Sequence, residues 1–141
     1  MKKRYLALIF IIVFGASNIS LKKGSLVSLS RIKMIESAGL PFVIGSSGEI
    51  GLYQISDCVL EDYNKYHKVK VAKWMLFIPW TNEKVAYWYL NTRIPSMLRH
   101  YEKPVTIRNI IISYNAGIGY VAHDKDLPEI TKKYLKKYGV K

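Results

Sequence analysis

Three consecutive isoleucines, Ile110 to Ile112, constrain the fold of this chain more than any other feature. Thr106 precedes them at a position suited to a helix N-cap, and Asn115-Ala116-Gly117 follows as a stop signal. The segment therefore predicts a helix over 107–114. A helix turn that carries three adjacent branched apolar side chains must be buried, so this helix is expected to belong to the core.

Apolar spacing and end signals predict four further helices, over residues 30–38, 55–65, 82–101 and 128–138. Asn82 is expected to cap the third of these helices, and Pro95 to kink it. Residues 45–51 hold three Gly and two Ser, which predicts a tight loop or a small hairpin. No convincing series of strands appears, so we expect one mainly helical domain, with any sheet small and near residues 42–55.

The first twenty residues have the layout of a secretory signal, with Met1-Lys2-Lys3-Arg4 before an apolar run. That run is shorter than the ~20 residues of a membrane-spanning helix. We expect residues 1–20 to be a signal peptide or an uncleaved signal anchor, residues 21–29 a short tether, and residues 30–141 the folded domain. The protein is then exported to the periplasm or cell envelope, and a retained anchor would associate it with the inner membrane.

The chain is strongly basic, with 22 Lys and Arg against 10 Asp and Glu, a formal net charge of +12. Such a surface attracts nucleic acid, anionic lipid or acidic cell-wall polymers, and it also simply aids solubility. Because export lowers the odds of nucleic acid, a cell-wall polymer is the favoured partner. We expect a monomer.

Cysteine and histidine are too scarce to suggest a metal site. The only Cys is Cys58, and the three His residues show no zinc-ligand spacing. We therefore predict neither a metal nor another cofactor. Cys58 lies in an apolar-looking stretch and is expected to be a buried structural thiol.

Glu36 is the candidate for acid chemistry. It lies near the end of the predicted helix 30–38, where a partly desolvated carboxyl would have a raised pKa suited to a general acid. Taken alone this signal is weak. It gains weight because Gln54 follows eighteen residues later, at the end of Gly48-Glu49-Ile50-Gly51-Leu52-Tyr53-Gln54. The block Ser113-Tyr114-Asn115-Ala116-Gly117 comes later still.

With these blocks the chain resembles the soluble lytic transglycosylase family, which shares its fold with goose-type lysozyme. The family carries a Glu-Ser pair, a Gly-x-x-Gly-Leu-Met-Gln block at this separation, and an Ala-Tyr-Asn-Ala-Gly block. Further matches are Asn82, Ala86, Tyr89 and Leu90 in a middle block and Thr131 and Tyr134 in a late one. The resemblance covers about residues 30–138. It departs at Gly45, where the family has Ser, and at Tyr53, Ala86 and Ile130.

The resemblance implies a lysozyme-like α+β fold, mainly helical, with a small loop or hairpin that lines the active-site cleft. It implies that Glu36 is the single catalytic acid and base. It also implies substrate contacts from Gln54, Tyr114, Asn115 and Tyr134, with Ser46 or Ser47 supplying the hydroxyl lost at Gly45. From the residues themselves, other roles stay open for these side chains. Gln54 is also suited to bracing its loop, Asn115 to capping or bracing the turn, and Tyr114 to packing in the core.

The implied reaction is cleavage of the β-1,4 bond between N-acetylmuramic acid (MurNAc) and N-acetylglucosamine (GlcNAc) of peptidoglycan strands, leaving a 1,6-anhydro-MurNAc end. Ordinary glycosidases need two carboxylates, and the matched motifs supply one. The other carboxylates, Glu49, Asp57, Glu61 and Glu83, do not fall at positions the family pattern reserves for catalysis. Three alternatives stay open: a true lysozyme with a second carboxylate or an ordered water, a non-catalytic wall-binding module or secretion adaptor, and a membrane-active basic protein.

Overall fold

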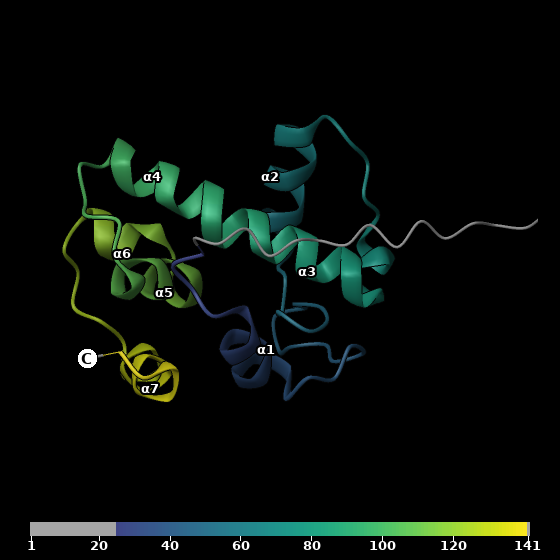
Figure 1. Ribbon diagram of the computed structural model, residues 1–141, viewed down its shortest axis with the longest axis horizontal. Helices are drawn as coiled ribbons and strands as arrows, with labels where there is room; N and C mark the ends of the chain where they lie inside the picture. Colours follow the sequence, from purple (N-terminus) through teal and green to yellow (C-terminus); the bar gives the residue numbers. More distant parts are fainter. Residues whose placement is uncertain (1–24, 141) are drawn as a thin grey trace, which may run out of the picture.

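The computed structural model describes residues 25–140, so the predicted export segment lies outside the described residues. Helices dominate, and the only β pairing among these residues consists of isolated bridges (Figure 1). The elements are α1 (Leu29–Ser37), α2 (Asp57–His67), η1 (Lys73–Phe77), α3 (Pro79–Trp88), η2 (Tyr89–Arg93), α4 (Ile94–His100), α5 (Ile107–Ala116), α6 (Ile118–Ala122) and α7 (Glu129–Tyr138). This arrangement confirms the mainly helical, lysozyme-like fold class.

Helix α5 lies at the centre of the packing, as the three isoleucines predict. It packs against α4, α6 and α7, and Ile110, Ile111 and Ile112 are all buried. Its start is fixed by the Thr106 hydroxyl, which accepts a hydrogen bond from the Asn109 backbone N–H at 3.1 Å. Its end is fixed by Gly117, whose φ of 94° breaks the helical path.

A long helical rod, α3–η2–α4, crosses the molecule on the far side of α5 from α7 (Figure 1). The predicted interruption near Pro95 is present as the π-helical segment η2, which ends just before Ile94 and Pro95. Because Pro95 has no N–H to donate, the preceding turn is free to widen. The widened turn carries Tyr89.

Residues 38–56 form the small irregular hairpin that the Gly-rich block predicts. Two antiparallel bridges, Ile44 with Ile50 and Ile50 with Ile55, hold it together. Gly48 and Gly51 have φ of 88° and 80°, in the left-handed region that favours glycine. The sheet is therefore as small as expected, and it lies within residues 42–55.

Asn82 braces this hairpin from α3, which corrects the prediction that it caps a helix. The helix begins three residues earlier, at Pro79, and Asn82 is fully buried inside it. The Asn82 side chain accepts from the Tyr53 N–H at 2.9 Å and donates to the Ile50 and Leu76 carbonyls at 2.8 Å each. A Cβ at Gly51 would overlap this amide, so Gly51 is required for the close approach.

Candidate active site

A cleft of about 550 Å³ lies between the end of α1, the hairpin, η2 and the end of α5. Its lining brings together most of the residues that the sequence singles out. The lining residues are Glu36, Gly45, Ser46, Glu49, Gln54, Ile55, Ser56, Cys58, Val59, Tyr89, Ser113, Tyr114, Asn115, Ala116, Gly117 and Ile130.

Glu36 projects into this cleft from the last turn of α1. The Tyr134 hydroxyl, on α7, donates a hydrogen bond to Glu36 Oε1 at 2.6 Å. Burial raises the pKa of the Glu36 carboxyl above its ordinary value; the Tyr134 hydrogen bond lowers this pKa and the negative charge of Glu49 raises it again. The net rise favours a protonated carboxyl, which is the form a general acid requires.

The hydroxyl of Tyr134 stays protonated at every pH of interest. Its pKa is raised far above the ordinary value by burial, by the charge of Glu36 and by their hydrogen bond. Tyr134 therefore acts as a fixed donor, and it holds the Glu36 carboxyl in one orientation.

Replacing Tyr134 by Phe removes the donor that lowers the pKa of Glu36. We expect kcat/KM to fall about tenfold, and the basic limb of its pH profile to move to higher pH. The other groups facing this carboxyl, Glu49 on the hairpin and Tyr114 on α5, are left in place. Tyr138→Phe is the matched control, because the Tyr138 hydroxyl accepts from the Ser28 N–H and Tyr138 is not among the residues that line the cleft. An unchanged pH profile for Tyr134→Phe would contradict this role.

Tyr114 and Gln54 line the cleft and also brace its walls. The Tyr114 O–H donates to the Tyr53 carbonyl oxygen, and its ring lies 6.1 Å from that of Tyr89. Burial raises the pKa of Tyr114 well above its ordinary value, and the charge of Glu36 adds to the rise. The Gln54 amide nitrogen donates to the Val43 and Gly51 carbonyls, so its Oε1 remains as an acceptor.

The two candidate serines are both exposed, but only one lies at the cleft. Ser46 lines it, whereas Ser47 is absent from the lining. The Ser47 backbone N–H donates to Glu49 Oε2 at 3.1 Å. Asn115 lines the cleft with a buried Oδ1 that has no hydrogen-bond partner among the described residues.

Cys58 is exposed and lines the cleft, so the prediction of a buried thiol is wrong. Cys58 is the second residue of α2, and its Sγ lies 3.1 Å from the Ser56 hydroxyl at the start of that helix. The apolar side of the helix starts one turn later, with Leu60 and Tyr63 buried.

Three lining residues were missed as site residues by sequence reasoning. Tyr89 matched the middle block of the family pattern but was assigned no substrate contact, and Ser113 was named only as the first residue of its block. The Ser113 Oγ is buried without a partner among residues 25–140. Glu49 was set aside because no catalytic position of the family falls on it. Its place within Gly48-Glu49-Ile50-Gly51 was the available signal, because that block turns its side chain back toward Gly45.

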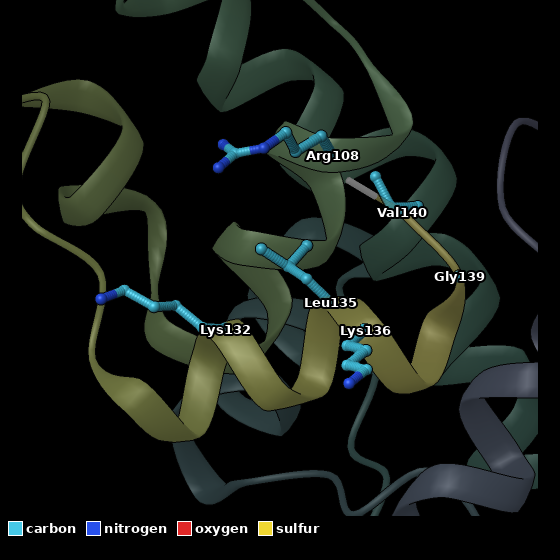
Figure 2. A pocket seen from close by; sticks show the side chains of 6 residues that line it. All are labelled: Arg108, Lys132, Leu135, Lys136, Gly139 and Val140. Carbon is cyan, nitrogen blue, oxygen red and sulfur yellow. The ribbon is translucent and has the colours of Figure 1, made fainter.

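A second hollow, of about 470 Å³, is lined by Arg108 of α5 and by residues in and just after α7 (Figure 2). Figure 2 shows Arg108 of α5 together with Lys132 and Lys136 of α7 around the apolar side chain of Leu135. Lys132 and Lys136 are two residues either side of Tyr134, so helical geometry turns them away from Glu36. Cationic groups alone line the polar part of this hollow, which therefore lacks an acid for glycosidic cleavage.

Within residues 25–140, no three His, Cys, Asp or Glu side chains are grouped so that they would hold a metal ion. None of the helices in this range has the length and apolar character needed to cross a bilayer.

The family described as "Transglycosylase SLT domain" matches residues 20–136, which is most of the chain. No curated protein matches, and no solved structure matches.

Proposed function

We propose that this chain, which belongs to the transglycosylase SLT domain family, is an exported lytic transglycosylase that uses Glu36 as its acid and then as its base. Membership of this family supports the general function, which is that of a transglycosylase acting on peptidoglycan in the cell envelope. The proposal adds the bond that is cleaved, between MurNAc and GlcNAc, and the 1,6-anhydro-MurNAc product.

The observation that carries the proposal is the setting of Glu36. Its carboxyl lies in the cleft at the end of α1, accepts from Tyr134, and has a pKa raised by burial. A carboxyl whose pKa is raised keeps its proton to higher pH and can deliver it to a glycosidic oxygen, which is a poor leaving group without protonation.

In the proposed reaction, Glu36 gives its proton to the oxygen that links MurNAc C1 to GlcNAc C4, and the C1–O bond breaks. The 2-acetamido group of MurNAc stabilises the positive charge at C1. The Glu36 carboxylate then takes the proton of the MurNAc 6-hydroxyl, whose oxygen bonds to C1. Protons and electrons balance without a water molecule. The 6-hydroxyl belongs to the same sugar as C1, so its proximity raises the rate of attack.

A lysozyme-type hydrolase is the second candidate, and Glu49 is the observation that favours it. This carboxylate lines the same cleft as Glu36 and acts on its pKa. A second carboxylate is what an ordinary glycosidase uses to activate a water or to form a covalent intermediate. The two candidates therefore differ in whether a water molecule enters the product.

Product analysis separates these candidates. Purified protein is incubated with sacculi in heavy-oxygen water, and the released muropeptides are analysed by mass spectrometry. We expect anhydro-muropeptides, lighter by one water than reducing ones and without the heavy label. Reducing muropeptides that carry the label would contradict the transglycosylase and support the hydrolase. The Glu36→Gln variant is the control for release by contaminants.

A further inference from the structure

The hairpin folds the side chain of Glu49 back over Gly45. The Gly45 N–H donates to the Glu49 carbonyl at 2.8 Å, and the Gly48 N–H donates to the Gly45 carbonyl at 3.1 Å. Gly48, with φ of 88°, makes the sharp turn between them. The result places the two ends of this five-residue segment side by side at the rim of the cleft.

Gly45 leaves a space that two oxygen atoms fill. A Cβ at Gly45 would lie 2.6 Å from Gln54 Oε1 and closer still to Glu49 Oε2, although real Cβ contacts essentially never fall under 3.0 Å. Any side chain at position 45 is therefore incompatible with the present placement of Glu49 and Gln54. Position 45 is where the lytic transglycosylase pattern has its serine, so the carboxylate and the amide oxygen stand where a serine hydroxyl would be.

The Glu49 carboxylate and Gln54 Oε1 can each accept further hydrogen bonds. Within the described residues, Glu49 accepts one hydrogen bond, from the Ser47 N–H, whereas a carboxylate can accept about four. Gln54 spends both amide hydrogens on the Val43 and Gly51 carbonyls, which leaves its Oε1 toward Gly45. Two acceptors that converge on one point of a cleft attract a donor, and glycan hydroxyl and acetamido N–H groups are donors.

We propose that Glu49 is a substrate-binding carboxylate, which together with Gln54 accepts a hydrogen bond from an O–H or N–H group of the glycan in place of the family's serine. The inference rests on the proposed function, because it assigns a contact within the same cleft. The proximity of Glu49 to the reacting centre agrees with the effect of its charge on the Glu36 carboxyl. Neither Ser46 nor Ser47 is then needed as the substitute hydroxyl.

The test is a set of variants assayed on soluble glycan strands. Glu49→Ala should raise KM about tenfold, because it removes an acceptor that is charged. It should also shift the basic limb of the kcat/KM profile to lower pH, because the negative charge that helps to keep Glu36 protonated is gone. Glu49→Gln keeps an acceptor, so it should show the same pH shift with a smaller rise in KM.

The exchange at position 45 provides the sharper test. Gly45→Ser should lower activity about tenfold, because its side chain collides with Glu49 and Gln54. The double variant Gly45→Ser with Glu49→Ala should recover activity beyond either single variant, because the closer of the two colliding side chains is gone and only the flexible end of Gln54 has to shift for the serine to fit. Glu61→Ala removes an exposed carboxylate of α2 and is the matched control, expected to leave KM and the pH profile unchanged.

Circular dichroism and thermal unfolding of each variant separate substrate binding from a purely structural brace. If Glu49→Ala lowered stability but left KM and the pH profile unchanged, the inference would be overturned and the proposed function would stand. If the double variant were no more active than Glu49→Ala, the inference that Glu49 takes the place of the family's serine would be overturned. Wild-type protein that cleaves no glycan would overturn the proposed function and this inference together.

Discussion

Glu36→Gln is expected to lower glycan cleavage by about 10³-fold or more while the fold is retained, because the amide can neither give nor take the proton. The substitution keeps the shape of the side chain, and the amide oxygen still accepts from the Tyr134 hydroxyl. The rate of anhydro-muropeptide release from sacculi is the measurement. Substantial residual turnover would show that another group supplies the proton.

The same variant should be more stable than the parent at neutral pH. Since folding raises the pKa of Glu36 above its ordinary value of 4.5, the carboxyl contributes its full stability below that pH. This contribution is lost as the pH rises through the raised pKa, because the buried group must ionise. Glutamine has no such loss, so the Tm of the variant should exceed that of the parent above this window and match it more closely in acid. A lower Tm at neutral pH would contradict the burial of the carboxyl.

Asn82→Ala is expected to lower the free energy of unfolding by about 3–5 kcal/mol. The side chain is fully buried and serves three backbone groups, the Tyr53 N–H and the Ile50 and Leu76 carbonyls. Alanine removes this partner from the Tyr53 N–H and the Leu76 carbonyl, leaves the Ile50 carbonyl with only the Ile55 N–H, and adds a cavity. Urea unfolding followed by circular dichroism measures the change.

Asn82→Asp sharpens this prediction, since it is nearly isosteric. Aspartate still accepts from the Tyr53 N–H, but its second oxygen would face two carbonyl oxygens with no hydrogen to donate. We expect a loss at least as large as for alanine at neutral pH. The control is Asn91→Ala, a partly buried side chain that donates to the Tyr87 carbonyl, with an expected loss within about 1 kcal/mol. Equal losses at positions 82 and 91 would contradict the bracing role of Asn82.

Local signals predicted the elements whose ends are determined by neighbouring residues. Helix α5 is an example, because Thr106, the isoleucine run and Gly117 lie within twelve residues and act on one another directly. The interruption before Pro95 is another, since a missing N–H acts on its own helix. The catalytic candidate was reached through spacing that matches a known family, and not from its local context.

The misses share a physical cause, which is contact between distant segments. Asn82 has a side chain suited to capping a helix, but its amide instead forms hydrogen bonds with backbone groups of the hairpin, 29–32 residues before it. The sequence neighbours of Cys58 predict a buried thiol, whereas the turn into α2 places this residue at the cleft. The place of Glu49 in the cleft depends on the turn at Gly48, which brings its side chain over Gly45.

The hydrogen bond between Tyr134 and Glu36 joins residues 98 positions apart. Helices α1 and α7 pack together, and further bonds from Ser28 and Arg31 to Tyr138 fasten the same pair. A chain in which α7 has not yet docked therefore lacks the Tyr134 donor that holds the Glu36 carboxyl in one orientation. In the proposed reaction the acid site is therefore complete only once α7 has docked against α1, so the start and the end of the folded domain have to meet before the glycan can be cleaved.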